Sequence, residues 1–240
     1  TRQHARADLV RNVSLLLLTI LASSLALYPV IIGLNGGVLR LSAGLMRSNI
    51  ELMEVLDSAI AKRDSDTDRH NYRVCLYSIR FAEALGLPEN EIRAVIAGAF
   101  LHDVGKIGIG DSILLKPGKL TAEEFAVMKT HVRLGTDIVA RSSWLDSARE
   151  VIEFHHERFD GSGYLRGLQG ESIPLAARLF AIVDVFDALT SRRPYKAPFP
   201  LEEAMRILAE SRCSHFDPHL LDVFEKIAAS VQAELAGLTE

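Results

Sequence analysis

The amino-acid sequence predicts an all-α protein, and three observations support this fold class. After residue 61, apolar residues recur at the spacing of a helix face, with turns at Gly and Pro between them. Thr121-Ala-Glu-Glu124 has the form of a capping box, which begins a helix. No segment of useful length alternates apolar and polar residues as a half-buried strand does. We therefore predict that the chain after residue 61 is all-α.

Helix starts and stops can be placed from Gly, Pro and capping residues. In chain order, the expected elements are a helix over 67–85 that stops at Gly86, a helix opened by Pro88, a helix from Thr121 past His131, a loop over Asp160–Gly170, a helix from Pro174 to Leu189, and final helices after Pro200.

The N-terminal part has a different composition. No charged residue occurs between Arg11 and Arg40, and residues 13–34 are mostly Leu, Ile, Val and Ala. As a helix, this segment spans roughly 33 Å, enough to cross the hydrocarbon layer of a membrane. We predict a flank over 1–12 and a transmembrane helix over 13–34. Basic residues lie on both sides, so the charges alone do not orient it.

Residues 35–60 are predicted to form a helical linker. Apolar residues follow a heptad pattern there, with Ser48 in the same seam: Val38, Leu41, Leu45, Leu52, Val55 and Ala59. This pattern favours a parallel homodimer. The alternative is a single amphipathic helix that packs on its own domain.

The charge of the chain argues against one class of partner. The formal net charge is −4 at pH 7, whereas proteins that bind nucleic acid polymers usually have a basic balance. A small anionic substrate remains compatible, because a local cationic pocket or metal cluster can hold one.

Two pairs of adjacent residues suggest a metal centre: His102 with Asp103, and His155 with His156. Adjacent helical side chains point about 100° apart, which suits ligands of two neighbouring ions better than ligands of one. A carboxylate such as Asp103 can bridge these ions. The nitrogen and oxygen ligands suit Fe, Mn, Ni or Zn better than Mg, and such a pair of ions can promote phosphodiester hydrolysis.

The motifs around these residues resemble those of one known family. Leu101-His-Asp-Val-Gly-Lys-Ile-Gly108 and Lys116-Pro-Gly-Lys-Leu-Thr121 resemble an HD-domain phosphohydrolase. Two further motifs narrow the resemblance to the HD-GYP family: His155-His-Glu-Arg-Phe-Asp-Gly-Ser-Gly-Tyr164, and Asp184-Val-Phe-Asp-Ala-Leu-Thr-Ser-Arg-Arg-Pro-Tyr-Lys196. The resemblance extends over about 61–226 and implies a helical bundle with a C-terminal helical extension there, followed by a helix end and tail over 227–240.

This resemblance implies a phosphodiesterase that hydrolyses cyclic di-GMP to pGpG, GMP or both, by attack of a hydroxide that bridges two metal ions, with iron or manganese favoured. The positions that match the family's metal ligands are His70, His102, Asp103, His131, His155, His156 and Asp184. Lys106 matches a lysine that approaches a substrate phosphate, and Asp103 and Lys106 are the expected catalytic residues. The resemblance places Asp187, Arg193 and Lys196 near the substrate, although Asp187 could instead cap a helix or pair with Arg193.

Asp66 raises the question of a third ion. It precedes His70 by one helical turn, and some members of the family bind a third metal with a carboxylate at this spacing. The alternative is that Asp66 or Asp68 caps the helix that begins near Thr67.

The signature loop departs from the family pattern. Gly163-Tyr164-Leu165 stands where the family has Gly-Tyr-Pro. Leu does not fix φ as Pro does, so we expect a less rigid loop. The family's loop is implicated in contacts with diguanylate cyclase domains, and this partner is what the change puts in doubt.

The combined prediction is a single-pass protein of a bacterial inner membrane with its hydrolase domain in the cytosol, where the messenger is found. Two alternatives stay open. One is a sensor or adaptor that binds cyclic di-GMP with little turnover, and the other is an HD hydrolase of another cyclic nucleotide.

Overall fold

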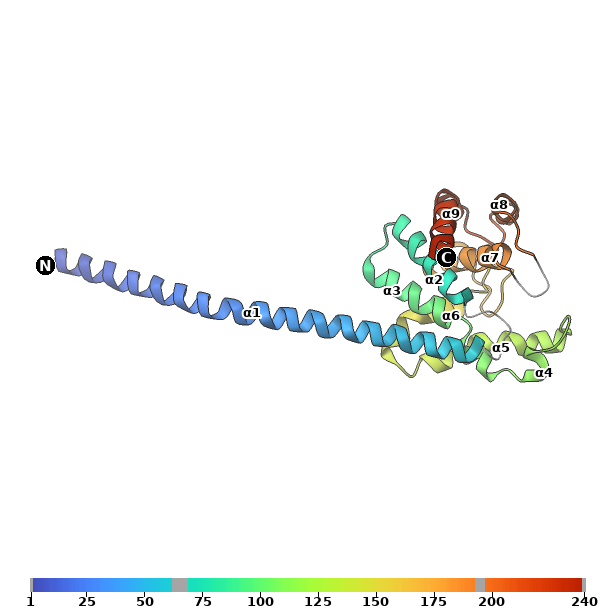
Figure 1. The fold of residues 1–240 in the computed structure, drawn as a ribbon, viewed down its shortest axis with the longest axis horizontal. Helices are drawn as coiled ribbons and strands as arrows, with labels where there is room; N and C mark the ends of the chain where they lie inside the picture. The colour runs from blue at the N-terminus through green and yellow to red at the C-terminus, as the bar shows by residue number, and fades with distance from the viewer. Residues whose placement is uncertain (1, 62–68, 193–196, 239–240) are drawn as a thin grey trace. The chain divides into compact units, whose positions relative to one another are not determined.

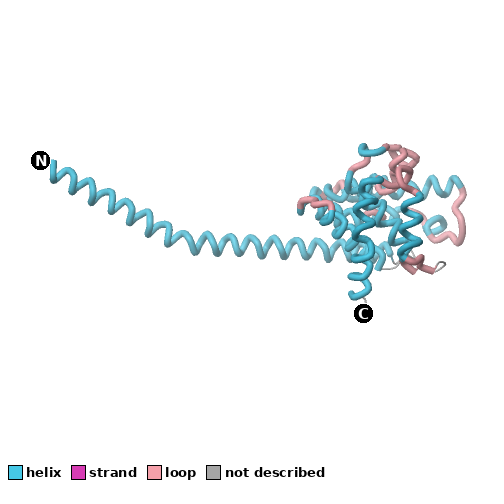
Figure 2. The backbone as a smooth tube through the Cα atoms, turned by 90° about the horizontal axis from the view of Figure 1, so that it is seen from above, coloured by secondary structure: helices cyan, strands magenta, loops and turns pink. Residues whose placement is uncertain are grey.

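The computed structural model describes residues 2–61, 69–192 and 197–238. Over these residues it contains α-helices and short 3-10 helices, and the only extended pairing is an isolated bridge between Arg212 and Phe216. Figure 1 shows the order of the helices, and Figure 2 shows the same backbone with helices joined by loops. The predicted all-α fold class is confirmed.

The chain divides into two compact units, Thr1–Leu52 and Met53–Glu240. The first unit is formed by helix α1 (Arg2–Ala61), which continues past Leu52 into the second unit and runs without interruption across the predicted borders at residues 12 and 34. These borders between flank, span and linker stay predictions.

The apolar part of α1 has no cover within the structure. The segment Asp8–Met53 is long and apolar enough to cross a membrane, and its most apolar window has a mean hydropathy of 2.4 with no buried residue. Leu25, for example, is 75% exposed. Large exposed apolar surfaces mark sites that another apolar phase or partner covers.

Helices α2 (Arg69–Ala84) and α7 (Leu175–Thr190) form the centre of the second unit. α2 packs against α3 (Glu89–Leu101), α7 and α9 (Pro218–Leu238). Their interface is an aromatic cluster in which Phe186 lies 5.2 Å from Tyr77 and 5.1 Å from Phe224, measured between ring centroids. Burial of each such ring contributes about 1.5–3 kcal/mol to folding.

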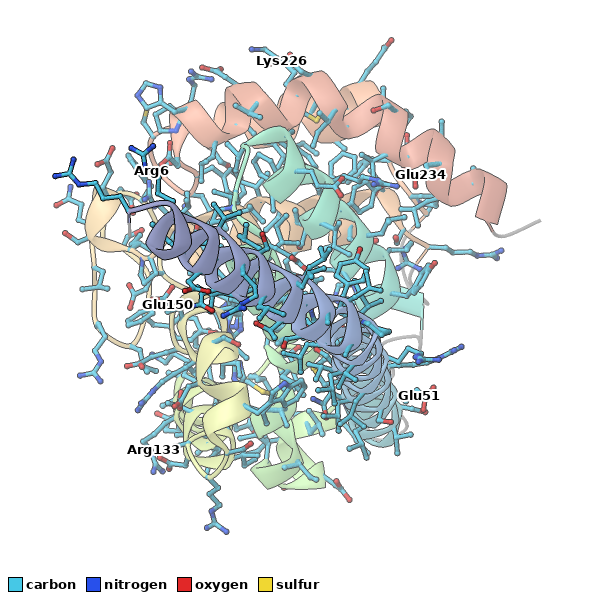
Figure 3. All side chains as sticks on the ribbon, turned by 90° about the vertical axis from the view of Figure 1, so that its left-hand side faces the viewer. Arg6, Glu51, Arg133, Glu150, Lys226 and Glu234 are labelled. Carbon is cyan, nitrogen blue, oxygen red and sulfur yellow. The ribbon has the colours of Figure 1, made fainter. Side chains whose placement is uncertain are left out.

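The remaining elements surround this centre. Helix α5 (Ala122–Val139) packs against the 3-10 helix η1 (Val104–Gly108) and against α6 (Arg149–Phe154), while α3 contacts α6 and the 3-10 helix η2 (Ser143–Ala148). α8 (Leu201–Glu210) packs on α7 and α9, and two short elements complete the set: α4 (Asp111–Leu114) and η3 (Gly170–Ser172). Charged side chains such as Arg133 and Lys226 point outward from α5 and α9 (Figure 3).

Most of the predicted helix borders agree with the structure to within two residues. The Thr121 capping box is confirmed, because the Glu124 N–H donates to Thr121 Oγ1 and the Thr121 N–H donates to the Glu124 carboxylate. Pro88, Pro174 and Pro200 are the residues immediately before α3, α7 and α8. The helix expected over 67–85 is observed as α2, with 67 and 68 outside the described residues.

Candidate metal centre

The seven predicted ligands lie on five α-helices or directly after them. His70 is in the first turn of α2, His102 and Asp103 follow α3, His131 is in α5, His155 and His156 follow α6, and Asp184 is in α7. The packing of these helices gathers all seven side chains into one region. Four of the histidines are buried, with exposed fractions of 5% or less: His70, His102, His131 and His155.

The ligands form two groups of three. In the first group, His70, His102 and Asp184 offer ligand atoms that all lie within 4.8 Å of one another. In the second group, the same holds for His131, His155 and His156. Three convergent nitrogen or oxygen atoms in each group can hold a divalent transition metal.

Asp103 lies between the two groups, and each of its oxygens faces one of them. Its Oδ2 is 3.1 Å from His102 Nε2, and its Oδ1 is 3.4 Å from His131 Nε2. A carboxylate in this position can place one oxygen on each of two ions. The arrangement therefore suits a pair of metal ions with Asp103 as the bridge.

The histidine tautomers fit metal binding. The Nδ1 atoms of His102, His131 and His155 are 2.8–3.1 Å from backbone carbonyl oxygens of their own helices. A carbonyl oxygen only accepts, so each Nδ1 must carry a proton, and the neutral rings of His131 and His155 then present an Nε2 lone pair. His131 Nε2 and His155 Nε2 are buried without a hydrogen-bond partner. Leaving such groups unpaired costs about 1–3 kcal/mol each, which a metal ion would offset.

The charges in the centre also suit cation binding. Burial lowers the pKa of His131, and it lowers the pKa of His156 to about 3, so both rings are neutral at pH 7. Burial alone would raise the pKa of Asp103, but the charges of His102 and Lys106 hold it well below its usual range. For His102, the effect of burial is outweighed by Asp103, which raises the pKa to about 9. A divalent cation would displace the proton shared by this pair.

Gly105 explains how the His102-Asp103 turn reaches α5. A Cβ atom at this position would lie 1.8 Å from the carbonyl oxygen of His131, so only glycine permits the contact between η1 and α5. The same turn positions Lys106, whose Nζ is 2.8 Å from Asp103 Oδ2. The lysine side chain is partly exposed, and its ammonium group lies beside the Asp103 carboxylate.

Asp187 is buried beside His70. We expected it near the substrate, but its side chain is only 1% exposed and lies behind His70. Its carboxylate accepts hydrogen bonds from His70 Nδ1 at 2.7 Å, from Arg73 Nε at 2.6 Å and from Ser191 Oγ at 2.9 Å. These donors surround the carboxylate within the protein and tie it to His70, and its expected place near the substrate stays a prediction.

Arg73 was missed by the sequence reasoning. It binds both oxygens of Asp187, which in turn orients His70 toward Asp184, and His70 Nε2 is 3.5 Å from Asp184 Oδ1. A carboxylate that receives the second N–H of a ligating histidine fixes the ring and raises its basicity. The available signal was the spacing, since Arg73 follows His70 by three residues on the same helix face.

The signature loop packs directly on the second ligand group. The ring of Tyr164 stacks on His156 with centroids 4.6 Å apart, and the Tyr164 N–H donates to the His156 carbonyl oxygen. A Cβ atom on Gly163 would lie 2.5 Å from the Glu157 Cα atom, so glycine allows this close approach.

Glu157, also missed, anchors the far side of this loop. Its buried carboxylate accepts from the backbone N–H groups of Arg166, Gly167 and Leu168 at 2.7–3.1 Å. Leu165 itself has a φ of +111°, a region that proline cannot adopt. The Leu at this position therefore accompanies a backbone conformation that a Gly-Tyr-Pro loop could not have.

Three predicted site residues lie outside the described residues: Asp66, Arg193 and Lys196. Their roles stay predictions, as does the pairing of Asp187 with Arg193.

Comparison with known proteins agrees with this architecture. The family model described as HD domain matches residues 54–220. A Thermotoga maritima protein named cyclic di-GMP phosphodiesterase is 44% identical over 183 residues, which cover 75% of this chain and 50% of the relative. A Vibrio cholerae protein named 3′3′-cGAMP-specific phosphodiesterase 2 is 42% identical over 201 residues, which cover 83% of this chain and 38% of the relative.

A solved structure has a similar fold. The crystal structure of a cyclic GMP-AMP specific phosphodiesterase from V. cholerae aligns with a TM-score of 0.60 at 20% identity, covering 75% of this chain and 48% of that chain. The chain spans half or less of the length of both curated relatives.

Proposed function

Because this chain belongs to the HD domain family, and its resemblance to the HD-GYP branch is confirmed, we propose that it is a metal-dependent phosphodiesterase that hydrolyses cyclic di-GMP. The observation that carries the proposal is the position of Asp103 between two groups of three ligands. The name of the T. maritima relative supports cyclic di-GMP as the substrate.

The residues that would hold the ions are those of the two groups, with Asp103 shared between them. When bound, two divalent ions would offset the negative charge of the phosphodiester and lower the pKa of a bound water molecule. Nitrogen and oxygen ligands without cysteine suit Fe, Mn, Ni or Zn, and within this set we propose iron or manganese from the family resemblance. Asp66 is proposed as a ligand of a third ion. Elemental analysis of anaerobically purified wild type and Asp66→Asn tests this role, and loss of about one ion per chain in the variant would support it. Equal metal content in both proteins would make Asp66 a helix cap.

The side chains of the protein bind and orient the substrate. Lys106, beside Asp103, can pair with a non-bridging phosphate oxygen and stabilise the negative charge that grows there during the reaction. Arg193 and Lys196 are proposed to bind substrate phosphates, for which their positive charges are suited. Asp187 and Arg73 contribute indirectly, by holding His70 in place.

Helix α1 is proposed to anchor the chain in a bacterial inner membrane through residues 13–34, with the hydrolase domain in the cytosol. The support is the length and apolar composition of Asp8–Met53. Recovery of the full chain in the soluble fraction of cells, without detergent, would contradict this anchor.

We also propose that the linker forms a homodimer. Val38, Leu41, Leu45 and Leu52 are each 59–68% exposed along the heptad seam. A monomeric mass for the full chain in detergent, by light scattering, would contradict the dimer.

We further propose that the Gly163-Tyr164-Leu165 loop contacts a diguanylate cyclase domain. Co-purification of the two proteins would test this contact.

A second candidate substrate has specific support. The V. cholerae relative at 42% identity is named for 3′3′-cGAMP, a cyclic dinucleotide with one guanine and one adenine. Both candidates have the same phosphodiester chemistry and differ in one base.

Incubation of the metal-reconstituted chain with cyclic di-GMP, 3′3′-cGAMP and cyclic di-AMP tests the proposal, with products separated by chromatography. We expect pGpG, GMP or both from cyclic di-GMP. Faster hydrolysis of 3′3′-cGAMP would favour the second candidate. Binding of cyclic di-GMP without any product, in protein shown to contain metal, would identify a sensor instead.

A further inference from the structure

Three side chains form a second feature beside the metal centre: Phe125, Lys129 and Tyr164, hereafter the aromatic rim. Phe125 and Lys129 are one turn apart on α5, and Tyr164 comes from the signature loop. The rings of Phe125 and Tyr164 meet edge to face with centroids 6.0 Å apart. Lys129 Nζ lies 5.4 Å from the Phe125 centroid and 5.6 Å from the Tyr164 centroid.

The aromatic rim adjoins the metal ligands. Tyr164 stacks on His156, and His156 lies 5.3 Å from His131 between ring centroids. A molecule whose phosphodiester reaches the two ligand groups can therefore place an attached group over the rim.

Two properties of the rim suit a flat ligand that carries hydrogen-bond acceptors. Phe125 is 45% exposed, although phenylalanine is usually buried. Among the described residues, no carboxylate forms an ion pair with Lys129. The two other α5 carboxylates nearby are already paired, Glu124 with Lys116 and Asp137 with Arg133. An exposed aromatic ring beneath an unpaired cation matches a flat, electron-rich ligand with acceptor atoms on its edge.

We propose that the aromatic rim binds a guanine base of the substrate, an inference that rests on the proposed cyclic dinucleotide phosphodiesterase function. The base stacks on Phe125, and the flexible Lys129 side chain moves from the ring to the base edge. Guanine offers the two acceptors O6 and N7 on that edge, whereas adenine offers N7 beside an amino donor. Lys129 is thus a specificity-determining residue that favours guanine over adenine.

Two variants test this role. Phe125→Ala should raise KM for cyclic di-GMP about 5- to 150-fold, the range for loss of one stacked base, with a smaller effect on kcat. Lys129→Met keeps the length of the side chain and should lower the preference for cyclic di-GMP over cyclic di-AMP about tenfold. Tyr164 is left unchanged because it also packs on the ligand His156.

The controls come from the same helix. Val127→Ala removes another exposed apolar group, and Arg133→Met removes an exposed charge; both should match wild type. Hydrolysis of bis(p-nitrophenyl) phosphate should be unchanged in Val127→Ala and Arg133→Met, and metal content by elemental analysis should be unchanged in all four variants. A melting curve for each variant verifies that it is folded.

Binding to metal-free protein separates this inference from the proposed function. Calorimetric titration should give tighter binding of GMP than of AMP, and Phe125→Ala should weaken GMP binding by the same range of about 5- to 150-fold. If dinucleotides are hydrolysed but Phe125→Ala leaves KM and GMP binding unchanged, the rim proposal is overturned and the function stands. If GMP binding depends on Phe125 but no cyclic dinucleotide is hydrolysed, the rim binds guanine and the proposed substrate is wrong. If no cyclic dinucleotide is hydrolysed and GMP binding does not depend on Phe125, both the rim proposal and the proposed function are overturned.

Discussion

At the scale of single residues, Asp103 has the central position in this protein. Its two oxygens face different histidine groups, and a third contact comes from Lys106. The proposed pairing of two ions therefore rests on this side chain. His131 and His155 have carbonyl partners for Nδ1, while their Nε2 atoms are buried without a hydrogen-bond partner and can donate a lone pair to a metal ion.

We predict that Asp103→Asn abolishes both metal binding and turnover. The amide keeps the size of the side chain but loses the negative charge and one of the two acceptor oxygens. Elemental analysis and a turnover assay on the same preparation check this. Full metal content with normal turnover would refute the bridging role.

A second prediction concerns the support of His70. Asp187→Asn should weaken metal affinity about 10- to 100-fold, because the amide is a poorer acceptor for the His70 Nδ1–H and no longer matches the charge of Arg73. Competition with a chelator of known affinity measures the effect. Arg93→Met, which removes a surface arginine paired with Glu89, is the matched control. An affinity equal to wild type in Asp187→Asn would show that Asp187 has no role at the metal centre.

At the scale of elements, the loop after α6 has two anchors. Tyr164 packs on His156 at one end, and Glu157 holds three backbone N–H groups at the other. Leu165 lies between these anchors with φ at +111°. A non-glycine residue in such a region costs of order 1–3 kcal/mol and persists only where its surroundings hold it.

Leu165→Pro, which restores the residue typical of the family's signature, should therefore destabilise this chain. Proline locks φ near −65°, so the loop must rearrange, and we expect a loss of at least about 2 kcal/mol in the free energy of unfolding. Leu165→Gly accepts the observed φ and should remain within about 1 kcal/mol of wild type. Urea denaturation compares the three proteins. Equal stability of Leu165→Pro and wild type would mean that the loop adopts another conformation in solution.

At the scale of the whole molecule, the two units differ in how they expose apolar side chains. The first unit exposes leucine and isoleucine side chains along α1, while the second buries its large apolar side chains around α2, α7 and α9. The seven ligands all belong to the second unit. The chemistry of the site should therefore not depend on the apolar helix.

Deletion of residues 1–46 should yield a soluble protein that keeps its fold, metal content and turnover. The reason is that this deletion removes the uncharged apolar segment and leaves every ligand and the aromatic core in place. Fractionation after a high-salt wash, followed by circular dichroism, checks the outcome. Recovery of the truncated protein in the membrane fraction would indicate a second membrane-binding surface.

Local patterns in the sequence determined several features of this protein. Helix periodicity, the Thr121 capping box and the prolines before α3, α7 and α8 depend on neighbouring residues, so the all-α fold class and most borders followed from them. The ligand set followed from residue chemistry and from motif resemblance. Each of these signals acts within a few residues along the chain.

Only the tertiary structure decided how distant residues meet. His70 and Asp187 are 117 positions apart, and nothing local indicates that one orients the other. The bridging position of Asp103, the anchoring of the signature loop by Glu157 and the meeting of Phe125 with Tyr164 likewise depend on helix packing. The sequence by itself determined which helices form and which residues are candidate ligands, because these are local properties. Which carboxylate lies between the two groups, which one supports His70 and which ring packs beside His156 were decided by packing between elements, since burial and contact are properties of the folded chain.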